Sequence, residues 1–523
     1  MSTPYWSSGG PWLVALTLCC GLARAGAPGD WPQWGHDMTR NMTCAETGLP
    51  DGFVAGKFIG ATDEIDMATT KNVRWIAKLG SQSYGNPIVA GGRVYVGTNN
   101  DSPRDPRFQG DRSVLNCLDA KSGALLWQLN VPKLGTGQAG DWELVGICSS
   151  PAVEGDRLWV LTNRGEIACL DVDGLADGND GPYRDEGRYL AGPGNEPIEL
   201  ADTDADLLWL FDMLAACGVS PHNITVGSPC LVGDRIWTTT SNGVDVDHAE
   251  TPAPDAPCLI AVDKNTGALL AREASGLSRR ILHSNWTSPA YLRTEALELV
   301  IFGGPDGWVY AFEPEPVLDE DGQPLLKEAW RCDVNKPEYR CDEQGRPRKY
   351  TARDGPSEVL GTPIVWDGKV YALIGQDPDH GQGVGRLVCI DPGGKGDVTK
   401  THVLWGYDRI HRSMSTLAVY DGLLFAADFS GFVYCLDAKS GKEHWVHDTL
   451  AHIWGSPLVA DGKVYIGNED GFLSILPATR EYDRKRVVEV DMTAPIYSSP
   501  VAADGVLYVA LHTHLFAIRE SGE

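Results

Sequence analysis

The chain has 523 residues, with 71 acidic against 44 basic side chains and a formal net charge of −27 at pH 7. Nucleic acids and anionic lipid surfaces bind proteins through basic faces, so this charge argues against both as partners. Beyond the N-terminus there is no run of about 18 apolar residues, so the sequence predicts no transmembrane segment.

Residues 1–25 are predicted to be a signal peptide. An apolar core over residues 12–20 is followed by Ala23-Arg24-Ala25, which fits the small-x-small rule for cleavage before Gly26. We therefore expect an exported protein, periplasmic or extracellular. The pair Cys19-Cys20 lies in this segment, but the residues before each cysteine suit lipidation poorly, so a lipid anchor is the less favoured alternative.

Residues 26–71 are predicted to form a strap that lies on the folded domain, because 31–70 is irregular and rich in Gly, Asp and Thr. Residues 72–77 (Asn-Val-Arg-Trp-Ile-Ala) then have the composition of a strand, but no further strands precede them.

A repeated phrase dominates the rest of the chain, and residues 453–476 show it most clearly. An apolar run that begins at Ser456-Pro457 leads through the hairpin turn Asp461-Gly462 to Val464-Tyr465-Ile466 and a third strand. Three strands bury only one face, so the unit needs copies of itself. Related phrases lie at 85–97, 150–160, 228–237, 288–301, 362–371, 415–425 and 499–509.

These eight units, with a shortest spacing of just over 40 residues, predict an all-β fold: an eight-bladed β-propeller of four-stranded antiparallel blades over residues 72–519. The last unit has three strands before the short tail 520–523. We expect the N-terminal strand 72–77 to complete this C-terminal blade, which closes the ring and removes its free edges.

A second motif follows the third strand of several units. Asp119-x-x-Ser122-Gly123 precedes Trp127, and Asp437-x-x-Ser440-Gly441 precedes Trp445. This phrase, and the segment Trp31-Pro32-Gln33-Trp34-Gly35, resemble secreted repeat proteins of the pyrroloquinoline-quinone (PQQ) propeller superfamily. The superfamily includes quinoprotein alcohol dehydrogenases and BamB-like envelope proteins. The resemblance covers residues 31–519 and implies the fold more specifically than it implies the cofactor.

Candidate site residues cluster just before the Ser-Pro phrases and in insertions between second and third strands. In a four-stranded blade both kinds of loop emerge on the same face, and loops on a rigid scaffold carry function. We predict a ligand mouth at the channel axis, with an aromatic floor under a rim of His and carboxylate. Its residues are Tyr84, His222, His283, Trp286, Glu358, Asp377, Asp379, His380, His411, His452, Trp454 and Tyr497. A plugged channel capped by polar loops is the alternative, and the histidines come from separate blades, which argues against a metal site.

A weaker candidate is a calcium site in an acidic, glycine-containing turn. Asp171, Asp173, Asp177 and Asp180 supply closely spaced oxygen ligands, although the spacing departs from an EF-hand loop. The alternative is a solvated turn. Elsewhere, Cys332 and Cys341 flank a polar loop and are the candidate disulfide of this exported chain.

The predicted function is a non-catalytic binding or scaffold module of the cell envelope, with an envelope protein or a small-molecule or sugar ligand as partner and a monomer as its form. The resemblance leaves a PQQ- and calcium-dependent alcohol or sugar dehydrogenase as the alternative. In that family PQQ stacks between a tryptophan and a disulfide of adjacent cysteines, which the mature chain lacks. A carbohydrate-binding propeller is the second alternative.

Overall fold

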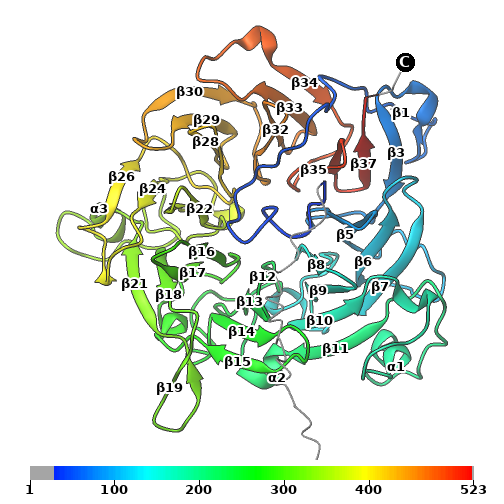
Figure 1. The fold of residues 1–523 in the computed structure, drawn as a ribbon, viewed down its shortest axis with the longest axis horizontal. Coiled ribbons are helices and arrows are strands. Elements are labelled where there is room, and N and C mark those ends of the chain that lie inside the picture. The colour runs from blue at the N-terminus through cyan, green and yellow to red at the C-terminus, as the bar shows by residue number, and fades with distance from the viewer. Residues whose placement is uncertain (1–28, 521–523) are drawn as a thin grey trace, which may run out of the picture.

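The computed structural model describes residues 29–520, so the predicted signal peptide lies outside the described residues. Eight sheets, each with four antiparallel core strands, stand around one axis as the blades of a propeller (Figure 1). The predicted fold class is confirmed. Within residues 29–520, no helix combines the length and hydropathy that a membrane crossing requires.

Each blade runs from an innermost strand at the axis to an outermost strand at the rim. The innermost strands, in blade order, are β4 (Ile88–Ala90), β8 (Ala152–Glu154), β12 (Cys230–Val232), β16 (Ala290–Arg293), β22 (Ile364–Trp366), β27 (Ala418–Tyr420), β31 (Leu458–Ala460) and β35 (Val501–Ala503). The second strands are β5 (Arg93–Asn99), β9 (Arg157–Leu161), β13 (Arg235–Thr239), β17 (Glu298–Gly303), β23 (Lys369–Leu373), β28 (Leu423–Ala427), β32 (Lys463–Gly467) and β36 (Val506–Ala510).

The third strands are β6 (Arg112–Asp119), β10 (Glu166–Asp171), β14 (Leu259–Asp263), β18 (Trp308–Phe312), β24 (Leu387–Ile390), β29 (Phe432–Asp437), β33 (Phe472–Pro477) and β37 (His514–Ile518). The outermost strands are β7 (Leu125–Pro132), β11 (Leu207–Asp212), β15 (Leu269–Arg272), β21 (Glu328–Asp333), β26 (Val403–Tyr407), β30 (Glu443–Asp448), β34 (Val488–Asp491) and, in the last blade, β3 (Val73–Lys78). Because β3 pairs with β37, the N-terminal strand completes the C-terminal blade as predicted.

The remaining helices and strands are short and lie in the loops between the blade strands and in the N-terminal segment. The helices are α1 (Glu186–Ala191), α2 (Met213–Cys217) and α3 (Pro337–Arg340), and the 3-10 turns are η1 (Met67–Thr69), η2 (Gly137–Ala139), η3 (Gly174–Ala176), η4 (Leu277–Arg280), η5 (Pro378–His380) and η6 (Arg484–Arg486). The added strands are β1 (Lys57–Phe58), β2 (Ile65–Asp66), β19 (Val317–Leu318), β20 (Pro324–Leu325) and β25 (Gly396–Asp397).

The Asp-x-x-Ser-Gly motif locks neighbouring blades together. The Asp119 carboxylate accepts hydrogen bonds from the backbone and hydroxyl of Ser122 and so fixes the turn after β6. Gly123 has φ +72°, and a Cβ there would lie 2.6 Å from the Trp75 ring of the preceding blade. The Trp75 indole in turn donates to the carbonyl of Ala120 at 3.0 Å. The motif therefore needs Gly both for its backbone and for the packed indole.

The Ser-Pro phrases link the blades a second time, close to the axis. At six blade junctions the backbone N–H of the residue that begins the phrase donates to the side chain at the same position of the next blade; this residue precedes a proline in every case but Thr416. The links run from Ser150 to Ser228, Ser228 to Ser288, Thr362 to Thr416, Thr416 to Ser456, Ser456 to Ser499 and Ser499 to Asn86. This belt of hydrogen bonds explains why a small hydroxyl residue recurs at that position.

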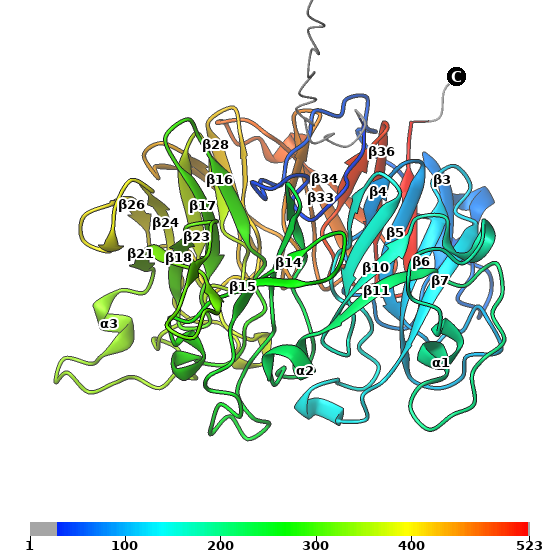
Figure 2. The same cartoon turned by 60° about the horizontal axis from the view of Figure 1, so that its bottom comes forward.

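The N-terminal strap crosses one end of the ring, opposite the face that carries α1, α2 and α3 (Figures 1 and 2). It meets the innermost strands of successive blades. Backbone N–H groups at the centres of these strands donate to the strap: Val89 to Trp31, Val153 to Pro32, Leu231 to Gln33, Tyr291 to Met38, Val365 to Thr39, Val419 to Asn41 and Val459 to Met42. The strap closes this end of the channel.

Arg40 anchors the strap at its centre. Its guanidinium is fully buried and donates to the carbonyls of Pro289 at 2.8 Å, Trp34 at 2.6 Å and Pro229 at 2.9 Å. One strap side chain thus binds the inner edges of blades three and four and holds the strap's own turn. Sequence periodicity does not reveal this role.

The predicted disulfide between Cys332 and Cys341 is wrong. All eleven cysteines of residues 29–520 are free thiols. Cys332 is a buried core residue of β21, opposite Val309 of β18. Cys341 follows α3, and its backbone forms an isolated β-bridge with Pro347. The polar loop is instead held by Arg340, which donates to the Asp333 carboxylate at 2.6 Å.

Candidate functional site

A cavity of about 680 Å³ opens at the axis on the face opposite the strap. Its walls come from the loops that enter the innermost strands and from the insertion that carries Asp377 and Asp379. Trp34 of the strap also lines it, and the Trp34 indole donates to the Thr362 hydroxyl at 3.2 Å. Because the strap closes the far end, the cavity is a blind mouth and not a through channel.

Aromatic rings form one wall of this cavity. Trp454 and Tyr497 stack with ring centroids 4.4 Å apart and an interplanar angle of 10°. Tyr84 contacts the Tyr497 ring at 5.5 Å. Trp142 and Trp286 also line the cavity. Tyr84, Trp286, Trp454 and Tyr497 belong to the predicted mouth, whereas Trp142 and Trp34 of the strap line the cavity without having been predicted.

The charged residues of the cavity lining are all acidic. Glu143, Asp377 and Asp379 face the cavity, and none of its lining residues is Lys or Arg. Burial raises the pKa of Asp377 to about 6. A ligand with several negative charges would therefore meet carboxylates with no basic partner, whereas neutral or cationic ligands suit this lining.

Three histidines converge beside the cavity, behind Trp286. His222 precedes β12, His248 lies in the loop from β13 to β14, and His283 precedes β16. The Nε2 atoms of His222 and His283 are 3.1 Å apart, and those of His248 and His222 are 3.2 Å apart. We call these three residues the histidine triad. His380 lies next to it, with its ring centroid 5.7 Å from that of His283.

Hydrogen bonding sets the tautomer of His222. Its Nδ1 lies 2.8 Å from the backbone carbonyl oxygen of Val244, so Nδ1 carries the proton and Nε2 presents a lone pair. Burial lowers the pKa of His222 to about 4, and burial together with His222 lowers the pKa of His283 to about 2. Both imidazoles are therefore neutral at physiological pH.

Two carboxylates lie close to the triad. Asp377 Oδ2 is 4.0 Å from His283 Nε2. Glu358 is fully buried, accepts from the backbone N–H of Ser284 at 2.8 Å, and accepts from the Tyr350 hydroxyl at 3.3 Å. Glu358 was predicted at the mouth, but it lies beneath the loop that carries His283.

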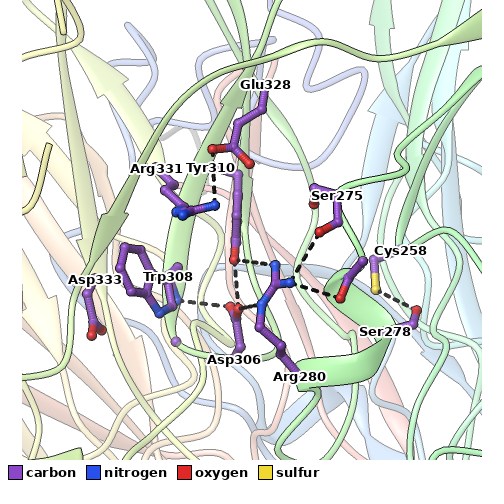
Figure 3. Close-up of polar contacts among 12 residues, drawn as sticks. Cys258, Ser275, Ser278, Arg280, Asp306, Trp308, Tyr310, Glu328, Arg331 and Asp333 are labelled. Atoms are coloured by element: carbon purple, nitrogen blue, oxygen red, sulfur yellow. Dashed lines mark hydrogen bonds and ion pairs between the residues drawn. The ribbon is translucent and has the colours of Figure 1, made fainter. Parts of the chain in front are cut away.

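A polar cluster fixes the other end of this loop (Figure 3). Arg280 of η4 contacts the Asp306 carboxylate at 3.2 Å and the Tyr310 hydroxyl at 3.1 Å. Tyr310 donates to the same carboxylate at 2.7 Å. Since His283 lies between Arg280 and Ser284, this cluster and Glu358 together hold the loop that carries His283.

The other two predicted rim histidines do not join the triad. His411 Nδ1 lies 2.9 Å from the Asp428 carboxylate, and His452 stacks on Phe429 with centroids 4.3 Å apart. Neither side chain lines the cavity.

The acidic turn after β10 brings part of the predicted calcium set together. Carboxylate oxygens of Asp171, Asp173 and Asp177 lie within 4.8 Å of one another. Asp173 also pairs with Arg93, and the Asp180 backbone N–H donates to Asp206. This turn does not contribute to the cavity lining.

The residues of this region that were not among the predicted site residues include Trp34, Trp142, Glu143, His248 and Tyr350. His248 lies in the insertion of blade three, next to Asp245 and Asp247, so its position was visible in the sequence. Nothing in the sequence shows that this loop reaches His222. Trp34 and Trp142 reach the cavity only because the blades close into a ring, which the local sequence does not show.

The sequence profile of the family described as outer membrane protein assembly factor BamB matches residues 33–244 and 385–480, more than half of the chain. BamB of Moranella endobia is 24% identical over 340 residues, which cover 62% of this chain and 73% of that protein. The 1-butanol dehydrogenase (cytochrome c) of Thauera butanivorans is 31% identical over 134 residues, 24% of this chain and only 18% of that relative.

Among solved structures, BamB from Moraxella catarrhalis superposes with a TM-score of 0.50 at 13% identity, covering 86% of this chain and 98% of that one. This likeness concerns the fold, whereas the family profile matches the sequence itself. The PQQ-like repeats, the eight closed blades and the profile match agree, and the chain belongs to the family of the outer membrane protein assembly factor BamB.

Proposed function

We propose that this chain is an exported, non-catalytic scaffold of the cell envelope that receives a segment of a partner protein in its axial cavity. Family membership supports an envelope role, since BamB is by name an assembly factor for outer membrane proteins. The observation that carries the proposal is the blind cavity of about 680 Å³ with aromatic walls.

The lining defines the chemistry of the segment. Stacked rings such as Trp454 and Tyr497 favour aromatic, aliphatic or guanidinium groups. Glu143, Asp377 and Asp379 favour a positive charge over a negative one. A hydrophobic segment with a basic side chain therefore suits the cavity best.

The alternative, a PQQ-dependent dehydrogenase, fits these residues poorly. PQQ is a tricarboxylic acid, and the described lining offers it carboxylates and no Lys or Arg. The stacking disulfide of adjacent cysteines is not available either, because all described cysteines are free and none is adjacent to another. The acidic turn that carries Asp171, Asp173 and Asp177 lies outside the cavity lining, so any calcium bound there would also lie outside it.

A titration of the purified mature protein with PQQ, with and without Ca²⁺, tests this assignment. Tryptophan fluorescence reports binding through Trp454 and Trp286, and dye-linked oxidation of alcohols and sugars reports turnover. We expect neither saturable quenching nor turnover. Calcium-dependent, saturable quenching with turnover, lost in Trp454→Ala, would overturn the scaffold assignment.

A further inference from the structure

In the histidine triad the Nε2 atom of His222 lies close to those of His248 and His283, and hydrogen bonds between these atoms cannot satisfy all three. His222 donates through Nδ1 to Val244, so its Nε2 has one lone pair. That lone pair faces Nε2 of His283 at 3.1 Å and Nε2 of His248 at 3.2 Å. Only one of these neighbours can donate to it. A cation that accepts all three lone pairs removes the conflict.

The distances suit such a cation. Zinc bound to imidazole has Zn–N bonds of about 2.0–2.1 Å, and tetrahedral geometry then places two ligand nitrogens about 3.3 Å apart. The two observed separations of 3.1 and 3.2 Å are close to this value. The three rings also surround one point, with centroids 4.3 to 4.9 Å apart.

A buried carboxyl group without a basic partner lies beneath the loop that carries His283. Among the described residues, no Lys or Arg forms an ion pair with the buried Glu358, whose partners are backbone N–H groups and the Tyr350 hydroxyl. The Nδ1 atoms of His283 and His380 are buried and have no hydrogen-bond partner among the described residues. Ligating histidines are typically oriented through their other ring nitrogen, and within the triad His222 is held in this way by the carbonyl of Val244.

We propose that His222, His248 and His283 bind one divalent transition-metal ion of the zinc class through their Nε2 atoms. Imidazole ligands favour zinc, copper, nickel and iron over magnesium or calcium. The side of the triad toward Asp377 and His380 leaves a further coordination position, for water or for Asp377. This proposal is independent of which partner enters the cavity. The metal would tie the loops before β12 and β16 to the insertion of blade three.

The test uses the full mature chain with a tag that binds no metal. After dialysis against a chelator, the protein is titrated with Co²⁺ and followed by its visible absorption, and Zn²⁺ competition is measured afterwards. We expect one Co²⁺ per chain, displaced by one Zn²⁺. His248→Ala should weaken the affinity by about 100-fold or more, because the loss of even an outer-contact residue costs about 10- to 100-fold.

His248 is exposed, so its replacement should leave the fold intact, which circular dichroism and the thermal midpoint of the variant will check. His411→Ala and His452→Ala are matched controls, since both histidines precede innermost strands but lie outside the triad; both should bind Co²⁺ like the wild type. A wild type that binds no Co²⁺, or a His248→Ala variant that binds it equally well, would overturn the proposal.

Discussion

The Nε2 atoms of His222 and His283 lie 3.1 Å apart, although 61 positions separate the two residues and they precede the innermost strands of different blades. Propeller geometry produces this contact. Loops before successive innermost strands emerge on one face near one axis, so side chains that are remote in sequence converge there. The same geometry gathers Tyr84, Trp454 and Tyr497 into a single wall.

Replacement of Arg40 by Met should destabilise the ring. The variant leaves the buried carbonyls of Trp34, Pro229 and Pro289 without their donor, at about 1–3 kcal/mol for each unsatisfied group, so we expect a loss of about 3 kcal/mol or more. Urea unfolding followed by tryptophan fluorescence measures it.

Arg279→Met is the matched control for Arg40→Met. Arg279 is exposed and pairs with the exposed Asp255, so its replacement should change stability by no more than about 0.5–1 kcal/mol. Equal midpoints for the two variants would contradict the anchoring role of Arg40.

Tyr310→Phe should cost about 1–3 kcal/mol, because the buried Asp306 carboxylate loses the hydroxyl donor that holds it at 2.7 Å. Tyr420→Phe serves as the control, since Tyr420 is exposed at the surface of blade six and should be neutral. Thermal unfolding of both variants checks this. An unchanged midpoint for Tyr310→Phe would contradict a stabilising role for the cluster in Figure 3.

The pairing of His411 with Asp428 predicts a pH-dependent stability. The hydrogen bond to Asp428 raises the pKa of His411 above its ordinary value, against burial and the Arg353 charge, which lower it. The stabilisation is therefore complete below the unfolded pKa of about 6.5 and is lost as pH rises through the higher folded value.

The difference in unfolding free energy between wild type and His411→Gln tests this. It should be largest below about pH 6.5 and shrink as the pH rises through the folded pKa. Proton NMR titration of His411 locates that folded pKa directly. A difference that grows with pH would contradict the assigned ion pair.

The thiols of Cys332 and Cys341 should react separately. Alkylation of the denatured, unreduced protein followed by peptide mass spectrometry is expected to find both cysteines modified, because neither forms a disulfide. Recovery of a linked Cys332–Cys341 peptide would contradict the structure.

The blades were predictable because their signals are local and repeated. Asp461-Gly462 and Asp119-x-x-Ser122-Gly123 each specify a turn through their own backbone chemistry. Even the closing strand followed from counting, since β3 had no partner nearby and the last blade lacked one strand.

The strap and the site were less predictable because their contacts depend on the closed ring. The strap's backbone pairs with a different blade every few residues, so it carries neither a helical nor a strand periodicity. Likewise, His248 and His222 meet only because the blade-three insertion folds back to the loop before β12, and loop length alone does not reveal that contact. The predicted disulfide failed for the opposite reason: proximity in sequence did not bring Cys341 to the buried Cys332.

Site-specific photo-crosslinking in the cell envelope tests the central claim most directly. A photoreactive amino acid replaces Tyr84 in the cavity wall or, as the control, Leu404, which is exposed on β26. We expect one discrete protein adduct from position 84, none from position 404, and loss of that adduct when Trp454→Ala is added. Adducts from position 404 alone, or an adduct at 84 that survives Trp454→Ala unchanged, would contradict the cavity as the binding site.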